Sequence, residues 1–142
     1  MKIRLIVHTL IFNDKREILI AKRSDSDSVL PGYWDIPGGT LGFGEDPAIG
    51  AMREVLEESG LKITSPNLFA YTSNVDSAKD TQFVRLIFIA QSPKDPVVKL
   101  NPEEHSEYSW VKTDRADSYK LVDYLPQIFK ALGAKDHNVI IF

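Results

Sequence analysis

The sequence predicts an α/β fold in which helices pack on a mixed β-sheet. The first half of the chain begins with two apolar, β-branched segments joined by the polar turn Asn13–Arg16, which is the pattern of a hairpin. One segment with helical spacing follows, and further apolar strands then lead to a second helical segment. This order of strands, helix, strands and helix is typical of a sheet covered by helices.

Apolar, β-branched segments mark the expected strands, and polar or proline-rich segments separate them. The expected strands are Lys2–Phe12, Glu17–Lys22, Leu61–Thr64, Leu68–Thr72, Gln82–Gln91, Tyr108–Val111 and the C-terminal segment Asn138–Phe142. The C-terminal segment is expected either to join the edge of its own sheet or to meet another chain, so a homodimer is one alternative.

Two helices are expected. Asp46 followed by Pro47 is typical of a capped helix start, and Gly60 is typical of a helix end. Between them, residues at helical spacing form a core-facing stripe of Ala48, Ala51, Met52, Val55 and Ser59. The second helix is expected over Val122–Leu132, with Gly133 at its end.

Length and composition narrow the class of protein. The 142 residues fit a single domain over residues 1–142. A net charge of -3 argues against bulk binding of nucleic acid, and the absence of cysteine excludes disulfides and thiolate chemistry. The apolar runs are shorter than the roughly 20 residues that span a bilayer, and the N-terminus lacks the pattern of a signal peptide. We therefore expect a cytoplasmic protein with no membrane partner.

The polar face of the first helix carries Glu54, Glu57 and Glu58 at spacings of three and four residues. Such like charges repel by roughly a few tenths of a kcal/mol per pair, and a hard divalent cation such as Mg²⁺ or Mn²⁺ would offset this cost. The alternative to a metal site is that these glutamates only form the solvent-exposed face of the helix. The pair Gly38-Gly39 favours a metal site, because glycine allows close approach of the backbone and leaves a carbonyl free for a cation.

The spacing of these residues resembles a known pattern. From Gly39, five residues lead to Glu45, and seven more lead to the segment Arg53–Leu61. This resembles the Nudix box, and all nine specified positions are satisfied over 23 residues. The resemblance implies the Nudix-type α/β/α sandwich with a mixed β-sheet. It also implies a MutT-like hydrolase that needs Mg²⁺ or Mn²⁺ and cleaves a diphosphate linkage in nucleoside diphosphate derivatives.

The resemblance also implies roles for individual residues. Glu57 and Glu58 resemble the main metal ligands, Glu54 assists them, and the Gly39 carbonyl is a further ligand. Arg53 would orient the glutamates, and Glu45 would support this arrangement from its loop.

The resemblance further implies an additional acid in a loop a few residues before a Trp, here Trp110, as both metal ligand and catalytic residue. Glu104 fits best, with Glu103 and Glu107 as alternatives. Whether Glu58 or Glu104 activates the attacking water stays open.

Substrate contacts are expected from residues before the box and from the loop of the box. Arg23 could bind a phosphate, and Tyr33 or Phe43 could stack on a base or flank the substrate. The structural alternatives are a surface arginine and aromatic core packing, and core packing is preferred for Trp34. The three histidines His8, His105 and His137 show no pairing pattern, so none is expected to be a ligand.

The substrate itself stays open. Asp76–Ala78, at 15 to 17 residues after the box, carry neither the proline nor the tyrosine that marks ADP-ribose or dinucleoside polyphosphate subfamilies. The leading expectation is hydrolysis of a nucleoside triphosphate, including oxidised forms, to monophosphate and pyrophosphate. One alternative is an ADP-ribose or nucleotide-sugar pyrophosphatase. Another is a non-catalytic nucleotide-sensing module, which the intact set of acids argues against.

Overall fold

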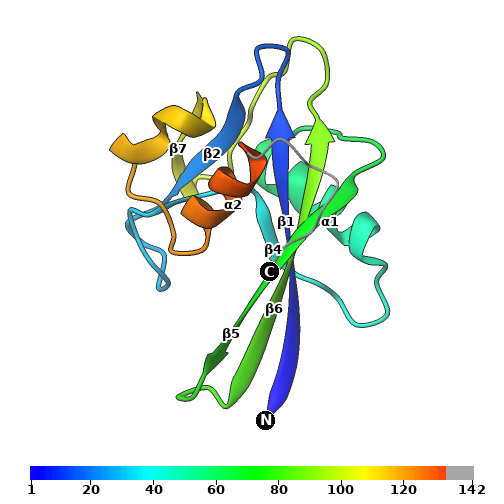
Figure 1. The fold of residues 1–142 in the computed structure, drawn as a ribbon, viewed down its shortest axis with the longest axis vertical. Coiled ribbons are helices and arrows are strands. Elements are labelled where there is room, and N and C mark those ends of the chain that lie inside the picture. The colour runs from blue at the N-terminus through cyan, green and yellow to red at the C-terminus, as the bar shows by residue number, and fades with distance from the viewer. Residues whose placement is uncertain (134–142) are drawn as a thin grey trace.

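The computed structural model describes residues 1–133 and shows a mixed β-sheet with helices on both faces (Figure 1). The predicted class and the sandwich architecture are confirmed. In chain order the elements are β1 (Lys2–Phe12), β2 (Ile18–Arg23), β3 (Trp34–Asp35), β4 (Gly38–Thr40), α1 (Pro47–Ser59), β5 (Asn67–Asp76), β6 (Thr81–Gln91), β7 (His105–Val111), the 3₁₀ helix η1 (Thr113–Ser118) and α2 (Leu125–Leu132).

The sheet has seven strands, and its main path runs β3-β2-β1-β6-β5. β4 pairs with β1, and β7 pairs with β2. β1 and β6 are parallel along their whole length, from Lys2 opposite Thr81 to Phe12 opposite Gln91, whereas the other pairs are antiparallel. The lower halves of β1, β5 and β6 extend beyond the helices as a long ribbon (Figure 1).

Alternation along β1 sends its apolar side chains to the two faces of the sheet. Val7 packs with Ala51 of α1, whereas Leu10 packs with Ile128 of α2 on the opposite face. The stripe predicted on α1 faces the sheet as expected. Ala51, Val55 and Ser59 are buried, and Ala48 and Met52 are partly buried against the same core.

The ends of α1 follow the predicted chemistry. The Asp46 carboxylate accepts hydrogen bonds from the N–H groups of Ala48 and Ile49 at 3.0 and 3.3 Å. Gly60 has φ of 73°, a left-handed conformation that glycine adopts without strain, and its N–H donates to Leu56 O. The helix therefore begins and ends at fixed positions, which fixes where its glutamates lie.

Several predicted boundaries were wrong for physical reasons. Leu61–Thr64 forms no strand, because its alternating burial comes from packing Leu61 and Ile63 into the core rather than from pairing. A further strand, β4, was not among the expected ones, and in it Gly38 and Gly39 pair with β1.

Three C-terminal features also differ from the prediction. β7 begins at His105, three residues before its predicted start at Tyr108. α2 begins at Leu125, three residues after its predicted start at Val122. The 3₁₀ helix η1 was not predicted.

The strand predicted over Asn138–Phe142 lies outside the described residues. Within residues 1–133 no helix is long and apolar enough to cross a membrane.

Candidate active site

An open cavity of about 550 Å³ lies where β2, β4, α1 and the turn before β7 meet. We call it the acidic cavity. Six site candidates from the sequence line it, among them the alternative acid Glu103: Arg23, Gly39, Glu54, Glu58, Glu103 and Glu104. Residues that sequence reasoning did not assign to a site also line it, among them Asp27, Asp35 and His105. Glu107 does not, because it faces outward and pairs with Lys22 at 3.4 Å.

Glu58 enters the cavity from α1. Its carboxylate accepts a hydrogen bond from the Gly38 N–H at 2.9 Å, which ties the helix to β4. Burial raises the pKa of Glu58 to about 8 against the opposing effect of this hydrogen bond, and the nearby charges of Glu54 and Glu104 add to the rise. Burial likewise raises the pKa of Glu54. These carboxyl groups are therefore held together at an electrostatic cost.

Arg53 organises the acids from beside the cavity. It binds Glu45 with two hydrogen bonds of 2.7 and 2.9 Å, an arrangement that lowers the pKa of Glu45 to about 2. The same guanidinium lies 2.9 Å from Glu54 and 3.2 Å from Glu57. Glu57 stays outside the acidic cavity, with 57% of its side chain exposed. Arg53 therefore contacts three glutamates and fixes their positions relative to one another.

Close approach explains the glycine pair in β4. A Cβ on Gly39 would lie 2.7 Å from the carboxyl group of Glu54, and one on Gly38 would lie 2.5 Å from the His8 ring. A side chain at either position would displace a group next to the cavity. The glycines therefore allow β4 to lie against both α1 and β1.

Tyr33 and Phe43 are not brought to the acidic cavity. The Tyr33 ring lies under the ammonium of Lys120 at 4.2 Å. Phe43 is 94% exposed at the far side of the box loop, with the guanidinium of Arg4 at 5.5 Å. Trp34 packs edge-on against Tyr119 at 5.0 Å in the core, as preferred from the sequence. The sequence pattern of aromatics near the box therefore does not indicate where they point.

The sequence pattern assigns no ligand role to His105. In the structure this residue is 8% exposed and lines the acidic cavity. Burial lowers its pKa, and the positive charge of Arg23 acts in the same direction. Its burial follows from a turn in which Asn101 O accepts the N–H groups of Glu104 and His105. The Asn-Pro start at Asn101 is a signal for this turn, but nothing in the sequence indicates that the turn folds over the box helix.

A second cavity of about 530 Å³ adjoins the first on the sheet face that α2 covers. We call it the sheet-face cavity. Arg23, Asp35 and residues of β4 line both cavities, while Arg85 and Asp123 line only this one. The two cavities therefore lie next to each other, with these shared residues between them.

Asp35 is the buried acid of the shared wall. Its carboxylate accepts hydrogen bonds from the Tyr124 hydroxyl and the Ile36 N–H, and it lies 3.5 Å from both His8 Nε2 and the Arg23 guanidinium. Burial alone raises the pKa of Asp35, but His8, Tyr124 and Arg23 outweigh it, and the pKa falls to about 2. Asp35 is therefore a charged group that fixes Arg23 between the cavities.

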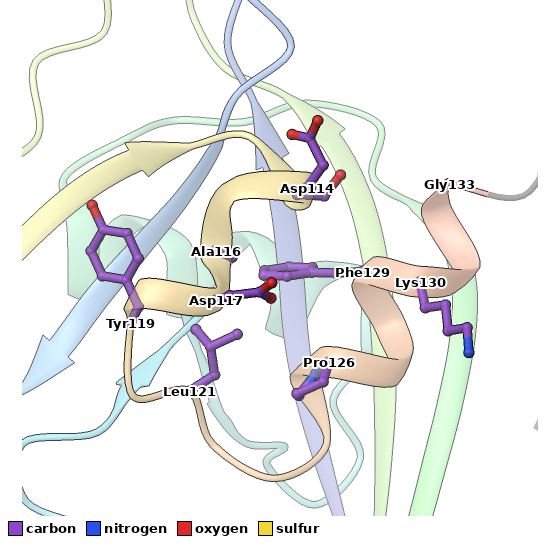
Figure 2. Close-up of a pocket in the computed structure, with 10 residues that line it drawn as sticks. Asp114, Ala116, Asp117, Tyr119, Leu121, Pro126, Phe129, Lys130 and Gly133 are labelled. Carbon is purple, nitrogen blue, oxygen red and sulfur yellow. The ribbon is translucent and has the colours of Figure 1, made fainter.

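A third hollow lies between η1 and α2, away from the box (Figure 2). Phe129 projects from α2 toward Ala116 of η1, and Asp114 and Lys130 lie at its rim (Figure 2). None of the residues that the sequence assigned to catalysis or metal binding lines it. The acidic cavity is therefore the better candidate for an active site.

The donor set of the acidic cavity fits a hard divalent cation. Carboxylate oxygens of Glu54, Glu58 and Glu104 line it together with Gly39. Burial raises the pKa values of Glu54 and Glu58, although Arg53 pairs with Glu54, and a cation bound beside them would favour their charged forms. These residues, rather than the exposed Glu57, face the space that a cation would occupy.

A sheet between helices and a cavity lined by acids are features that comparison with known proteins assigns to a class. The family model described as NUDIX domain matches residues 2–132, so the chain belongs to the Nudix family. It is a nucleotide pyrophosphohydrolase of that family.

Individual relatives agree with this assignment. The nucleoside triphosphatase NudI of Escherichia coli K12 is 33% identical over 130 residues, covering 85% of this chain and 90% of NudI. The MutT protein of Methanosarcina mazei is 30% identical with a TM-score of 0.79, covering 91% of each chain. A MutT NUDIX hydrolase of Burkholderia pseudomallei, 23% identical, shares the fold with a TM-score of 0.78 over 92% of this chain and 98% of its own.

Proposed function

We propose that the protein hydrolyses a nucleoside triphosphate to a nucleoside monophosphate and pyrophosphate, with Mg²⁺ or Mn²⁺. The observation that carries this proposal is that the acidic cavity and the sheet-face cavity are neighbours, with Arg23 and Asp35 lining both. The first cavity suits a cation-bound polyphosphate, and the second offers room for the nucleoside. The name of NudI, a nucleoside triphosphatase, supports the same substrate class.

The acids supply the cation site in this proposal. Glu54, Glu58, Glu104 and the Gly39 carbonyl hold the cation, and Glu57 joins them from the same face of α1 by giving up its contact with Arg53. A bound divalent cation neutralises the charge of the diphosphate and lowers the pKa of bound water. Arg53, held by Glu45, keeps Glu54 in place.

The chain's own residues then position the reactants. Arg23, at the wall between the cavities, contacts a phosphate and is kept there by Asp35 and Asp27. Water oxygen forms a bond to phosphorus, the bond from that phosphorus to the bridging oxygen breaks, and pyrophosphate leaves. Glu58 or Glu104 accepts the proton of the water. Tyr33 and Phe43 have no part in this arrangement, because neither lines either cavity.

A substrate panel tests the proposal. Phosphate release is measured with canonical and oxidised nucleoside triphosphates, ADP-ribose, nucleotide sugars and dinucleoside polyphosphates, with and without Mg²⁺ or Mn²⁺. Pyrophosphatase and phosphatase serve as parallel coupling enzymes. We expect a metal-dependent signal with triphosphates and pyrophosphatase.

Other outcomes of the panel point elsewhere. A signal that needs phosphatase and appears only with ADP-ribose or nucleotide sugars overturns the triphosphate proposal in favour of a diphosphate-linked substrate. No turnover with any substrate and either metal, together with nucleotide binding, favours the sensing module.

A further inference from the structure

His105 stands out among the residues of the acidic cavity because it is the buried side chain without a hydrogen-bond partner there. The residue is 8% exposed, and its Nδ1 has no partner in the described part of the chain. One of its ring nitrogens and single carboxylate oxygens of Glu58 and Glu104 all lie within 4.8 Å of one another. A buried imidazole that has an unpaired ring nitrogen and lies beside two carboxylates is an arrangement that a shared metal ion explains.

An irregularity in the sheet directs His105 into the cavity. β7 pairs with β2 in regular register as far as Lys22 opposite Glu107, and the next pair is Arg23 opposite His105. Ser106 is therefore an extra residue in β7. Without this bulge, His105 would share the outward face of Glu107, two residues away, which pairs with Lys22 at the surface. Bulges commonly redirect a side chain in this way next to active sites.

The turn that carries His105 is anchored at both of its ends. Asn101 accepts backbone hydrogen bonds from Glu103, Glu104 and His105, through its side chain for Glu103 and its carbonyl for the other two. Ser24, directly after β2, donates from its N–H to Glu104 O and from its hydroxyl to Glu103 O, both at 2.9 Å. The backbone that carries the imidazole is therefore fixed by hydrogen bonds within the protein.

We infer that His105 is a nitrogen ligand of the divalent cation bound in the acidic cavity, alongside Glu58 and Glu104, and that it makes the site select a first-row transition cation such as Mn²⁺ over Mg²⁺. The chemical reason is that Mg²⁺ strongly prefers oxygen ligands, whereas transition cations accept imidazole nitrogen. This inference deepens the proposed function by specifying the cation, and it rests on that function only in placing a cation there.

Spectroscopy on Mn²⁺-loaded protein tests the inference without turnover. Electron spin-echo modulation detects nitrogen bound to Mn²⁺, so protein labelled with ¹⁵N only in histidine is compared with unlabelled protein. We expect ¹⁴N modulation in unlabelled protein and its replacement by the ¹⁵N pattern on labelling. Bound Mn²⁺ with no histidine coupling in the unaltered chain overturns the inference, and this arm depends on no variant.

Two matched variants identify the histidine. His105→Gln is expected to abolish the histidine coupling, whereas His8→Gln, which alters the other buried histidine of the described residues, is expected to retain it. Coupling that survives in His105→Gln overturns the assignment. Circular dichroism of each variant checks that the protein is folded.

Calorimetric titration gives the selectivity. We expect His105→Gln to raise the Kd for Mn²⁺ about tenfold and to change the Kd for Mg²⁺ by less than about twofold. Equal changes for the two cations overturn the selectivity. Histidine coupling without hydrolysis of any panel nucleotide would remove the proposed function and leave the inference standing, whereas hydrolysis without coupling would do the reverse.

Discussion

The Glu58 side chain has three roles. It is a candidate metal ligand, it accepts a hydrogen bond from β4, and it is a candidate base. Glu58→Gln is expected to lower turnover by at least about a hundredfold while the protein stays folded, since the amide oxygen can still accept the Gly38 N–H but carries no charge. The measurement is the hydrolysis rate beside the melting temperature.

The exposed Glu107 provides a control for Glu58. Its substitution by Gln removes a glutamate charge that faces solvent near Lys22, outside both cavities. This control is expected to keep full activity. A fully active Glu58→Gln would contradict the role given to Glu58.

Asp35 gives a pH-dependent prediction. Its pKa is about 2 in the folded protein against 3.8 ordinarily, so its contribution to stability is present above pH 3.8 and is lost as the pH falls toward 2. Asp35→Asn is therefore expected to lower the free energy of unfolding by about 2–3 kcal/mol at neutral pH, because Arg23 loses its buried counter-charge.

Denaturant unfolding of both proteins from pH 7 to pH 2 measures this effect. The difference between them is expected to shrink below about pH 4. Asp114→Asn, which changes an exposed acid on η1, serves as the control and should show little difference at any pH. A difference that stays constant across the range would mean that Asp35 stabilises through shape rather than charge.

At the scale of elements, α1 shows what sequence can predict. Local chemistry fixes its limits at Asp46 and Gly60, and the 3.6-residue repeat separates its core face from its acidic face. Because the glutamates lie on one rigid helix, the box spacing was enough to predict that Glu54 and Glu58 share a site. These predictions depend only on residues close together in the chain.

Other elements depend on distant partners and could not be predicted in this way. His105 lines the site because of a bulge between β2 and β7, and Asp35 is buried because Tyr124 arrives from the start of α2. Leu61–Thr64 has the alternation of a strand but no partner with which to pair. Sequence periodicity shows which side of a segment is buried, but it does not show what covers that side.

The cap of α1 gives a prediction at this scale. Asp46→Ala removes the acceptor for the N–H groups of Ala48 and Ile49 and is expected to lower the free energy of unfolding by about 1 kcal/mol. Thermal unfolding measures it, and Asp46→Asn, which can still accept these bonds, should lose less. Equal losses in the two variants would assign the effect to the carboxylate charge at the helix start.

At the scale of the molecule, the acidic cavity is built from three separate parts of the chain, namely residues 23–40, 54–58 and 103–105. A cation bound there stabilises only the folded form. When Mg²⁺ is about tenfold above its Kd, we expect the free energy of unfolding to rise by about 1.4 kcal/mol, with a melting temperature a few degrees higher.

The comparison for this prediction uses NaCl of equal ionic strength, and Glu58→Gln should show a smaller shift. An unchanged melting temperature in millimolar Mg²⁺ would count against a site that is already formed in the free protein.

The parallel pairing of β1 with β6 has a consequence for biosynthesis. Lys2 lies opposite Thr81 and Phe12 lies opposite Gln91, so each residue of β1 is 79 positions away in the chain from its partner in β6. During translation, β1 and the whole of α1 are synthesised before β6, the strand that pairs with β1 at the centre of the sheet. The nascent chain must therefore carry the apolar residues of β1 without their parallel partner until residue 91 has emerged. We therefore expect chaperone capture and aggregation of stalled chains to be concentrated in this interval.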